Sequence, residues 1–208
     1  MLYIISKKTR EIVWKVGPEY GIASAMKALG TIIGPHHGHI IPKGLPGTGN
    51  VLVIDNGVAG GDGNPNPAAP QQGTWKALRD CSRVLEINPV TLELVWEFTA
   101  LTQGYSCEGE DMSRFCSRYK SAAQRLPNGN TLITEPDCGR IFEVTPECET
   151  VWEYISPYNL SKTEGLFFSD VFRGYRFPYE SAPQLGPPTE RAVVPPKHSE
   201  FRILPVGE

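Results

Sequence analysis

The stretch that decides the fold is residues 83–98, RVLEINPVTLELVWEF. Apolar and polar side chains alternate on both sides of an Asn-Pro turn, which is the pattern of a β-hairpin whose second strand carries Trp96. Residues 140–154 repeat the arrangement as RIFEVTPECETVWEY, with Trp152 in the corresponding place. A third copy, residues 3–16, carries its tryptophan at the same position. The chain therefore contains a repeated hairpin.

A second kind of hairpin precedes two of these copies. Residues 45–55 (LPGTGNVLVID) parallel residues 126–135 (LPNGNTLITE), and both read as a strand, a Gly-rich turn and another strand. Two hairpins in succession make a four-stranded unit, and such a unit repeating every ~40–55 residues is typical of a β-propeller blade. We therefore expect an all-β fold: a partial β-propeller of about two and a half four-stranded blades.

The repeat spacing divides the chain into this partial propeller, residues 1–180, and a tail. In chain order, the expected units are a half blade at residues 2–16, a blade at 36–99, a blade at 119–155, the start of a further blade at 165–178 and a Pro-rich tail at 181–208. Residues 58–80 have the composition of a loop insertion within the first full blade. Because a propeller needs ~4–8 blades to close, we expect either missing N-terminal blades or self-association to cover the strand edges.

Composition excludes several classes of function. The chain has 208 residues and a net charge of −3, so it lacks the basic field that attracts nucleic acid or an anionic membrane. No apolar run approaches the ~18 residues of a membrane-spanning helix, so no membrane insertion is expected. The five cysteines show no C-x-x-C spacing, so no zinc site or closed disulfide set is indicated. The first residues do not form a signal peptide, and the compartment is unknown from targeting.

Several segments together resemble the bacterial arylsulfate sulfotransferase (arylsulfotransferase) family. They are residues 35–42 (PHHGHIIP), 50–57 (NVLVIDNG), 121–132 (SAAQRLPNGNTL), 140–146 (RIFEVTP) and 172–176 (FRGYR). The resemblance covers the C-terminal part of that family's six-bladed propeller. It implies transfer of a sulfuryl group from an aryl sulfate to a phenol through a histidine intermediate, with no cofactor, in a periplasmic or extracytoplasmic location. The small-molecule partners implied are an aryl sulfate and a phenolic acceptor.

The resemblance places the nucleophile in the histidine run, and we assign it to His37, with His39, Arg83 and Arg125 as substrate-binding residues. A neutral imidazole is a competent nucleophile near pH 7, and the planar fork of an arginine matches the oxygens of a sulfuryl group. Strand alternation puts His37 and His39 on one face. His37 is followed by Gly38, which we expect to leave its face open.

Other interpretations of the same residues stay open. The histidines could cap a strand, or a His-x-His pair could bind a metal, although no carboxylate or cysteine completes a recognisable metal site. Arg83 and Arg125 could form blade-to-blade salt bridges. The chain as a whole could be a non-catalytic binding scaffold. Residues 88–96 also loosely resemble a repeat of quinoprotein-like propellers, although no adjacent cysteine pair is present to contact a quinone.

Overall fold

The computed structural model describes residues 2–16, 28–30, 32–57, 82–105, 115–117, 119–156 and 171–186. Over these residues the expected all-β fold is confirmed. The ten described strands are β1 (Leu2–Ile5), β2 (Ile12–Val16), β3 (Pro35–Ile40), β4 (Val51–Asp55), β5 (Arg83–Ile87), β6 (Leu94–Thr99), β7 (Ala122–Arg125), β8 (Thr131–Glu135), β9 (Arg140–Val144) and β10 (Thr150–Ile155). The short 3₁₀ helices are η1 (Leu101–Gln103), η3 (Pro136–Cys138), η4 (Tyr179–Ser181) and η5 (Pro183–Leu185).

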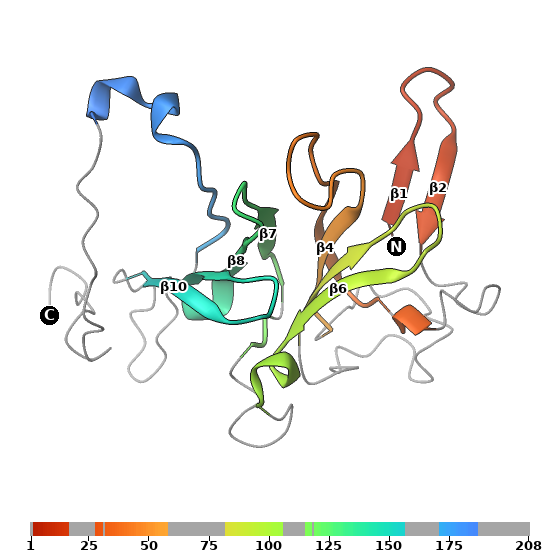
Figure 1. Ribbon diagram of the computed structural model, residues 1–208. Helices are drawn as coiled ribbons and strands as arrows, with labels where there is room; N and C mark the ends of the chain where they lie inside the picture. The colour runs from red at the N-terminus through yellow and green to blue at the C-terminus, as the bar shows by residue number, and fades with distance from the viewer. Residues whose placement is uncertain are drawn as a thin grey trace, which may run out of the picture.

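The strands form two antiparallel four-stranded sheets and one separate hairpin (Figure 1). The first sheet has the order β3-β4-β5-β6 and the second sheet has the order β10-β9-β8-β7, so in each sheet every strand pairs with its neighbour in the chain. The N-terminal hairpin pairs β1 with β2. The two sheets do not close into a ring within the described residues, and a propeller remains a prediction.

The outer hairpins β1-β2, β5-β6 and β9-β10 repeat in detail. In each of them the register shifts by one residue immediately before the tryptophan, because the preceding valine has no partner on the facing strand. The bulged valines are Val13, Val95 and Val151. The three tryptophans therefore occupy equivalent positions, as the sequence repeat predicts.

Successive units are joined through these tryptophans. The indole N–H of Trp14 in β2 donates to the carbonyl of Pro89, 2.7 Å away in the β5-β6 turn. The indole N–H of Trp96 in β6 donates to the carbonyl of Pro146, 2.8 Å away in the β9-β10 turn. Each joint thus links the outermost strand of one unit to the outer turn of the next. We call this contact the Trp–Pro joint.

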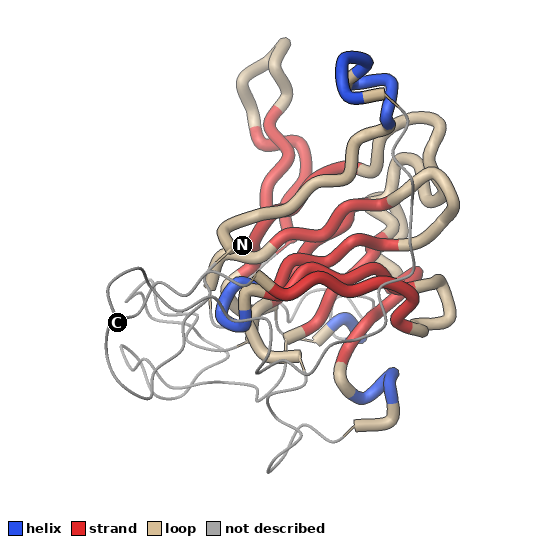
Figure 2. The backbone as a smooth tube through the Cα atoms, turned by 90° about the vertical axis from the view of Figure 1, so that its left-hand side faces the viewer, coloured by secondary structure: helices blue, strands red, loops and turns tan. Residues whose placement is uncertain are grey.

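Two apolar clusters fill the spaces between the units, whose strands run side by side in Figure 2. Between the two sheets, the rings of Phe98, Phe115 and Phe142 lie with centroids 5.2–5.9 Å apart. Between the hairpin and the first sheet, Val16 packs with Leu85 and other buried aliphatic side chains. Burying these side chains holds the separate sheets together.

The turn between β3 and β4 differs from the sequence parallel. The backbone N–H of Ile41 donates to Asn50, and that of Leu126 donates to Asn130, both over 2.8 Å. Ile41-Pro42, rather than Leu45-Pro46, is therefore equivalent to Leu126-Pro127, and the first turn is longer. The expected loop insertion at residues 58–80 lies outside the described residues, as do residues 165–170 and most of the tail.

Candidate functional site

The candidate site begins with an irregularity in β3. His36 pairs with Ile54 and His39 pairs with Leu52, so His37 and Gly38 together face a single residue of β4. His37 adopts a φ of +51°, in the left-handed region that residues other than glycine rarely occupy. The corresponding strand of the second sheet, β7, pairs with β8 without any such shift. The bulge is therefore not a repeated feature of the innermost strands that the structure describes.

The half-buried imidazole of His37 bridges two other segments. Its Nδ1 lies 3.0 Å from the carbonyl oxygen of Ala123 in β7. Because a carbonyl only accepts, Nδ1 carries the proton and Nε2 presents its lone pair. Nε2 lies 3.0 Å from the hydroxyl of Tyr175, which donates to it. Arg173 Nη1 in turn donates to the same hydroxyl oxygen over 3.1 Å. A cation, a phenol and an imidazole thus stand in one hydrogen-bonded row.

The environment keeps His37 neutral. Burial, together with the neighbouring His39 and Arg173, lowers the pKa of its imidazole from 6.5 to about 4. The ring centroids of His37 and His39 are 4.6 Å apart, so the two rings lie together as expected. His39 donates from Nδ1 to the backbone carbonyl of His37 over 2.9 Å. The ring of His36 instead contacts the carbonyl of Gly34, 3.0 Å away.

Gly38 has a different role from the one expected of it. A Cβ atom at this position would lie 2.6 Å from Cδ2 of Leu2 and 3.6 Å from Cγ2 of Val53. The small residue therefore makes room for β1 against the first sheet. It is the bulge, not Gly38, that turns His37 toward the second sheet.

Cations and aromatic rings gather around Arg173 and Tyr175, the two residues that reach His37. Lys120 Nζ lies 5.0 Å from the ring centroid of Tyr119 and 5.9 Å from that of Phe172. The guanidinium of Arg173 lies 5.5 Å from the Phe172 centroid and 5.9 Å from that of Tyr175. Phe172 is 61% exposed and Tyr175 is 45% exposed. We call these five residues the cation–aromatic rim, a surface suited to a ligand that is both aromatic and anionic.

Arg83 lies in an ion-pair network within the first sheet. Its Nε is 2.9 Å from Oδ2 of Asp55, and its Nη1 is 3.3 Å from Oε1 of Glu97. The other oxygen of Asp55 accepts the backbone N–H of Ile33 over 2.6 Å. Asp55 is fully buried, so the guanidinium compensates a charge that water does not reach.

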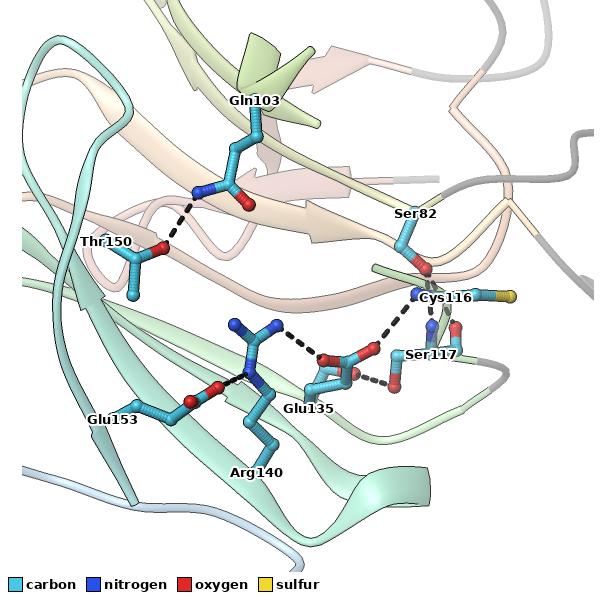
Figure 3. Close-up of polar contacts among 9 residues, drawn as sticks. Ser82, Gln103, Cys116, Ser117, Glu135, Arg140, Thr150 and Glu153 are labelled. Atoms are coloured by element: carbon cyan, nitrogen blue, oxygen red, sulfur yellow. Dashed lines mark hydrogen bonds and ion pairs between the residues drawn. The ribbon is translucent and has the colours of Figure 1, made fainter. Parts of the chain in front are cut away.

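The second sheet repeats this network around Arg140. Its guanidinium contacts Glu135 and Glu153, as Figure 3 shows. Glu135 also accepts the backbone N–H of Cys116 over 3.0 Å. Burial raises the pKa of the Glu135 carboxyl, against the opposing effect of Arg140. The arginine at the start of each third strand thus stabilises its own sheet.

Arg125 joins the two sheets. Its Nη2 is 2.6 Å from Oε2 of Glu86, and the side chains are only 6% and 4% exposed. Its Nη1 donates to the carbonyl of Gly129 over 3.1 Å, and its guanidinium lies 5.3 Å from the Trp96 ring centroid. Both predicted arginines are therefore held by carboxylates, Arg83 within a sheet and Arg125 between sheets. The cation that reaches the surroundings of His37 is Arg173.

The sequence prediction omitted Tyr175 and Arg173. A signal for them was present, because the FRGYR segment corresponds to residues 121–125 (SAAQR) of the innermost strand of the second sheet. The structure places residues 171–178 beside that strand: Gln124 donates to the carbonyl of Arg176 and accepts its backbone N–H, over 2.9 and 2.8 Å.

The described residues contain no group of three His, Cys, Asp or Glu side chains placed to hold a metal ion. In the same part of the chain, no helix is long and apolar enough to span a membrane. No protein-family model, curated protein or solved structure matches the chain. The geometry of the site is therefore the basis for a function.

Proposed function

We propose that the hairpin and the two sheets are successive blades of a β-propeller of the arylsulfotransferase type, and that His37 carries a sulfuryl group from an aryl sulfate to a phenol. Two features support the propeller: each sheet is a four-stranded antiparallel meander, and the Trp–Pro joint repeats between units. The innermost strand of each sheet and the segment 171–178 lie side by side through the His37 and Gln124 contacts. Innermost strands line the central channel of a propeller.

The observation that carries the proposed chemistry is the 3.0 Å contact between His37 Nε2 and a phenolic oxygen. The proton on Nδ1 is fixed by the Ala123 carbonyl, so Nε2 carries the lone pair, which can attack once the substrate displaces the Tyr175 hydroxyl. A pKa of about 4 keeps the ring neutral throughout the physiological range. Tyr175 shows that this lone pair can receive a phenol at hydrogen-bond distance.

The reaction would proceed in two balanced steps. First, Nε2 of His37 attacks sulfur, the N–S bond forms, and the bond from sulfur to the aryl oxygen breaks, which releases an aryl oxide. Second, the oxygen of an acceptor phenol attacks sulfur, the N–S bond breaks, and the phenolic proton passes to solvent, which replaces the proton taken up by the aryl oxide. Both steps need cations or N–H donors near the sulfuryl oxygens.

The remaining residues have distinct parts in this proposal. Arg173 and Lys120 supply positive charge, and His39 lies beside His37, where it can contact a sulfuryl oxygen. Arg83 and Arg125 hold the strands on which the site is built. Because Tyr175 occupies the position that sulfur requires, the substrate must displace its hydroxyl from Nε2.

The test is turnover of p-nitrophenyl sulfate with phenol as acceptor. His37→Asn should abolish release of p-nitrophenol, whereas the matched variant His36→Asn should retain it, because the His36 ring contacts only its own turn. In protein quenched with the aryl sulfate alone, mass spectrometry should find about 80 Da added to the peptide that holds His37, the mass of a covalently held sulfuryl group. Full activity in His37→Asn would exclude this residue as the nucleophile. A digest that covers the peptide holding His37 and contains no adduct would exclude it as well.

A second candidate function is non-catalytic binding of aromatic anions. The cation–aromatic rim favours it, because its exposed rings and cations need no reaction to hold such a ligand. Binding of p-nitrophenyl sulfate without release of p-nitrophenol, lost on Arg173→Gln but kept on His37→Asn, would favour this function.

A further inference from the structure

At the outermost strand of the second sheet, β10, only the tryptophan half of a Trp–Pro joint is found among the described residues. Trp14 and Trp96 each donate to a proline carbonyl of the next unit. Trp152 occupies the equivalent position in β10, yet among the described residues its indole N–H has no acceptor. The second sheet therefore presents the donor half of a third joint.

Burial shows the same open face. Phe98 in β6 is fully buried because the second sheet covers it, whereas Tyr154, at the equivalent position of β10, is 40% exposed. Trp152 is 42% exposed. Two large aromatic side chains thus lie uncovered on the outer face of the second sheet, at positions that are covered in the first sheet.

Part of the next unit is already seated on this face. Arg176 forms an ion pair with Glu143 and lies 4.9 Å from the ring centroid of Trp152. This repeats the joint between the sheets, where Arg125 pairs with Glu86 and stacks on the preceding tryptophan. Residues 171–178 therefore take the place of an innermost strand beside the second sheet, and the described residues supply no outer hairpin for that unit.

The N-terminal hairpin has the structure that this position requires. Residues 5–14 read ISKKTREIVW and residues 87–96 read INPVTLELVW. The two turns have the same backbone conformation. Arg10 N donates to Ser6 O and Leu92 N donates to Asn88 O, both over 2.8 Å. Arg10 and Leu92 have φ values of +64° and +62°. Among the described residues β1 pairs only with β2, so this hairpin stands there as half of a unit.

We propose that a second copy of this chain seats its β1-β2 hairpin on the outer face of the second sheet. Lys7 stands where Pro89 stands in the β5-β6 turn, so its carbonyl accepts the Trp152 indole N–H. Arg10 corresponds to Cys148 of the β9-β10 turn, whose Sγ contacts the backbone carbonyl of Glu97, so Arg10 is placed near Glu153, whose 39% exposed carboxylate contacts Arg140. This inference rests on the blade arrangement proposed above and not on the reaction.

The same contact made in both directions closes a ring. Each chain contributes its hairpin and two full sheets, so two copies supply six units, within the ~4–8 that propellers use. Three copies would supply nine, beyond that range. A head-to-tail contact that closes after two copies gives a defined dimer rather than a filament.

Sedimentation velocity of the full chain over a range of concentrations tests this proposal without any substrate. We expect a dimer that Trp152→Ala and Arg10→Glu convert to monomer. Its dissociation constant should rise about thirtyfold in Trp152→Phe, which removes one hydrogen bond from each of the two contacts. One control should keep the dimer: Lys7→Pro, which introduces the residue of the other two turns and keeps the carbonyl that accepts the indole N–H. Circular dichroism checks the fold of each variant.

Each contrary outcome overturns the inference. A chain that stays monomeric at all concentrations leaves the face to another part of a longer polypeptide or to a different protein. A dimer unaffected by Trp152→Phe and Arg10→Glu uses another surface, and open polymers contradict a closed pair. Activity toward p-nitrophenyl sulfate does not enter the readout, so this failure is distinct from failure of the proposed reaction.

Discussion

The Arg125–Glu86 ion pair gives a quantitative test of how the two sheets are joined. Both side chains are nearly inaccessible to water, at 6% and 4% exposed, so solvent screens the pair little. Arg125→Ile leaves the Glu86 carboxylate buried without its cation, and Glu86→Ile leaves the Arg125 guanidinium buried without its anion. Breaking a buried pair by removing one partner costs about 3–5 kcal/mol of unfolding free energy. We expect each single variant to lose about that much.

The chain itself suggests the compensating change. Ile4 faces Trp14 as Glu86 faces Trp96, and Ile40 pairs with β4 as Arg125 pairs with β8. The Trp14–Pro89 joint thus has isoleucine at both positions where the Trp96–Pro146 joint has the Arg125–Glu86 ion pair. Arg125→Ile/Glu86→Ile copies that pair into the second joint.

We expect this double variant to lie within about 2 kcal/mol of the parent chain, since replacing a buried pair by apolar residues is often neutral or stabilising. The main remaining cost is the Asn50 amide, which donates to Glu86 over 2.6 Å and would lose its acceptor. Urea unfolding of the four proteins provides a double-mutant cycle, with the exposed Glu93→Gln as a control for changes that matter little. Single variants that each lose under about 1 kcal/mol, or a double variant as unstable as the sum, would refute this account of the joint.

Three further predictions concern the site. His37 should titrate by NMR with a midpoint of about 4; because this pKa lies below the unfolded value of 6.5, the neutral imidazole's contribution to stability is complete above pH 6.5 and is lost as the pH falls through 4, and a midpoint near 6.5 would contradict the observed burial. Tyr175→Phe should make His37 react several-fold faster with diethyl pyrocarbonate, because the lone pair of Nε2 is no longer engaged; an unchanged rate would mean that the contact does not exist in solution. Gly38→Ala should lower the unfolding free energy by about 0.5–1.5 kcal/mol, since its Cβ would meet Cδ2 of Leu2 at 2.6 Å and force that side chain off its rotamer, and hydrogen exchange should locate the loss in β1, whereas uniform exchange would speak against this packing.

The parts of the fold that depend on local pattern could be predicted from the sequence. Alternating apolar residues around a Pro-containing turn specify a hairpin within some fifteen residues, and the recurrence of Trp96 and Trp152 made the units recognisable. These features depend on neighbours in the chain, so no tertiary information was needed. The histidine run was assigned to the site through the family resemblance, and its role stays a prediction.

The details of the site depend on contacts that the pattern does not contain. Strand alternation assumes one residue facing one residue, so it could not reveal that β3 carries an extra residue at His37. It also gives no partner for an arginine. Arg83 and Arg125 were assigned to the substrate, but each meets carboxylates from strands distant in sequence. Tyr175 reaches His37 from 138 residues away, a contact that only the folded chain creates.

Features that recur in every unit serve the fold, whereas a feature found in one unit points to function. The bulged valines, the Trp–Pro joint and the carboxylate–arginine networks recur from unit to unit, so each is explained by the need to build and join sheets. The bulge at His37 does not recur, since β7 forms its pairs with β8 without one.

A left-handed residue other than glycine costs about 1–2 kcal/mol. In the second sheet such residues, Lys120 and Ser121, lie before the strand, and β7 itself pairs regularly without one. Such strain persists where the surroundings hold it in place. Here the Ala123 carbonyl on one side and the Tyr175 hydroxyl on the other fix the imidazole. The one departure from the repeat among these inner strands thus orients a neutral histidine toward a phenol, and this is the reason to look for the chemistry of the chain at His37.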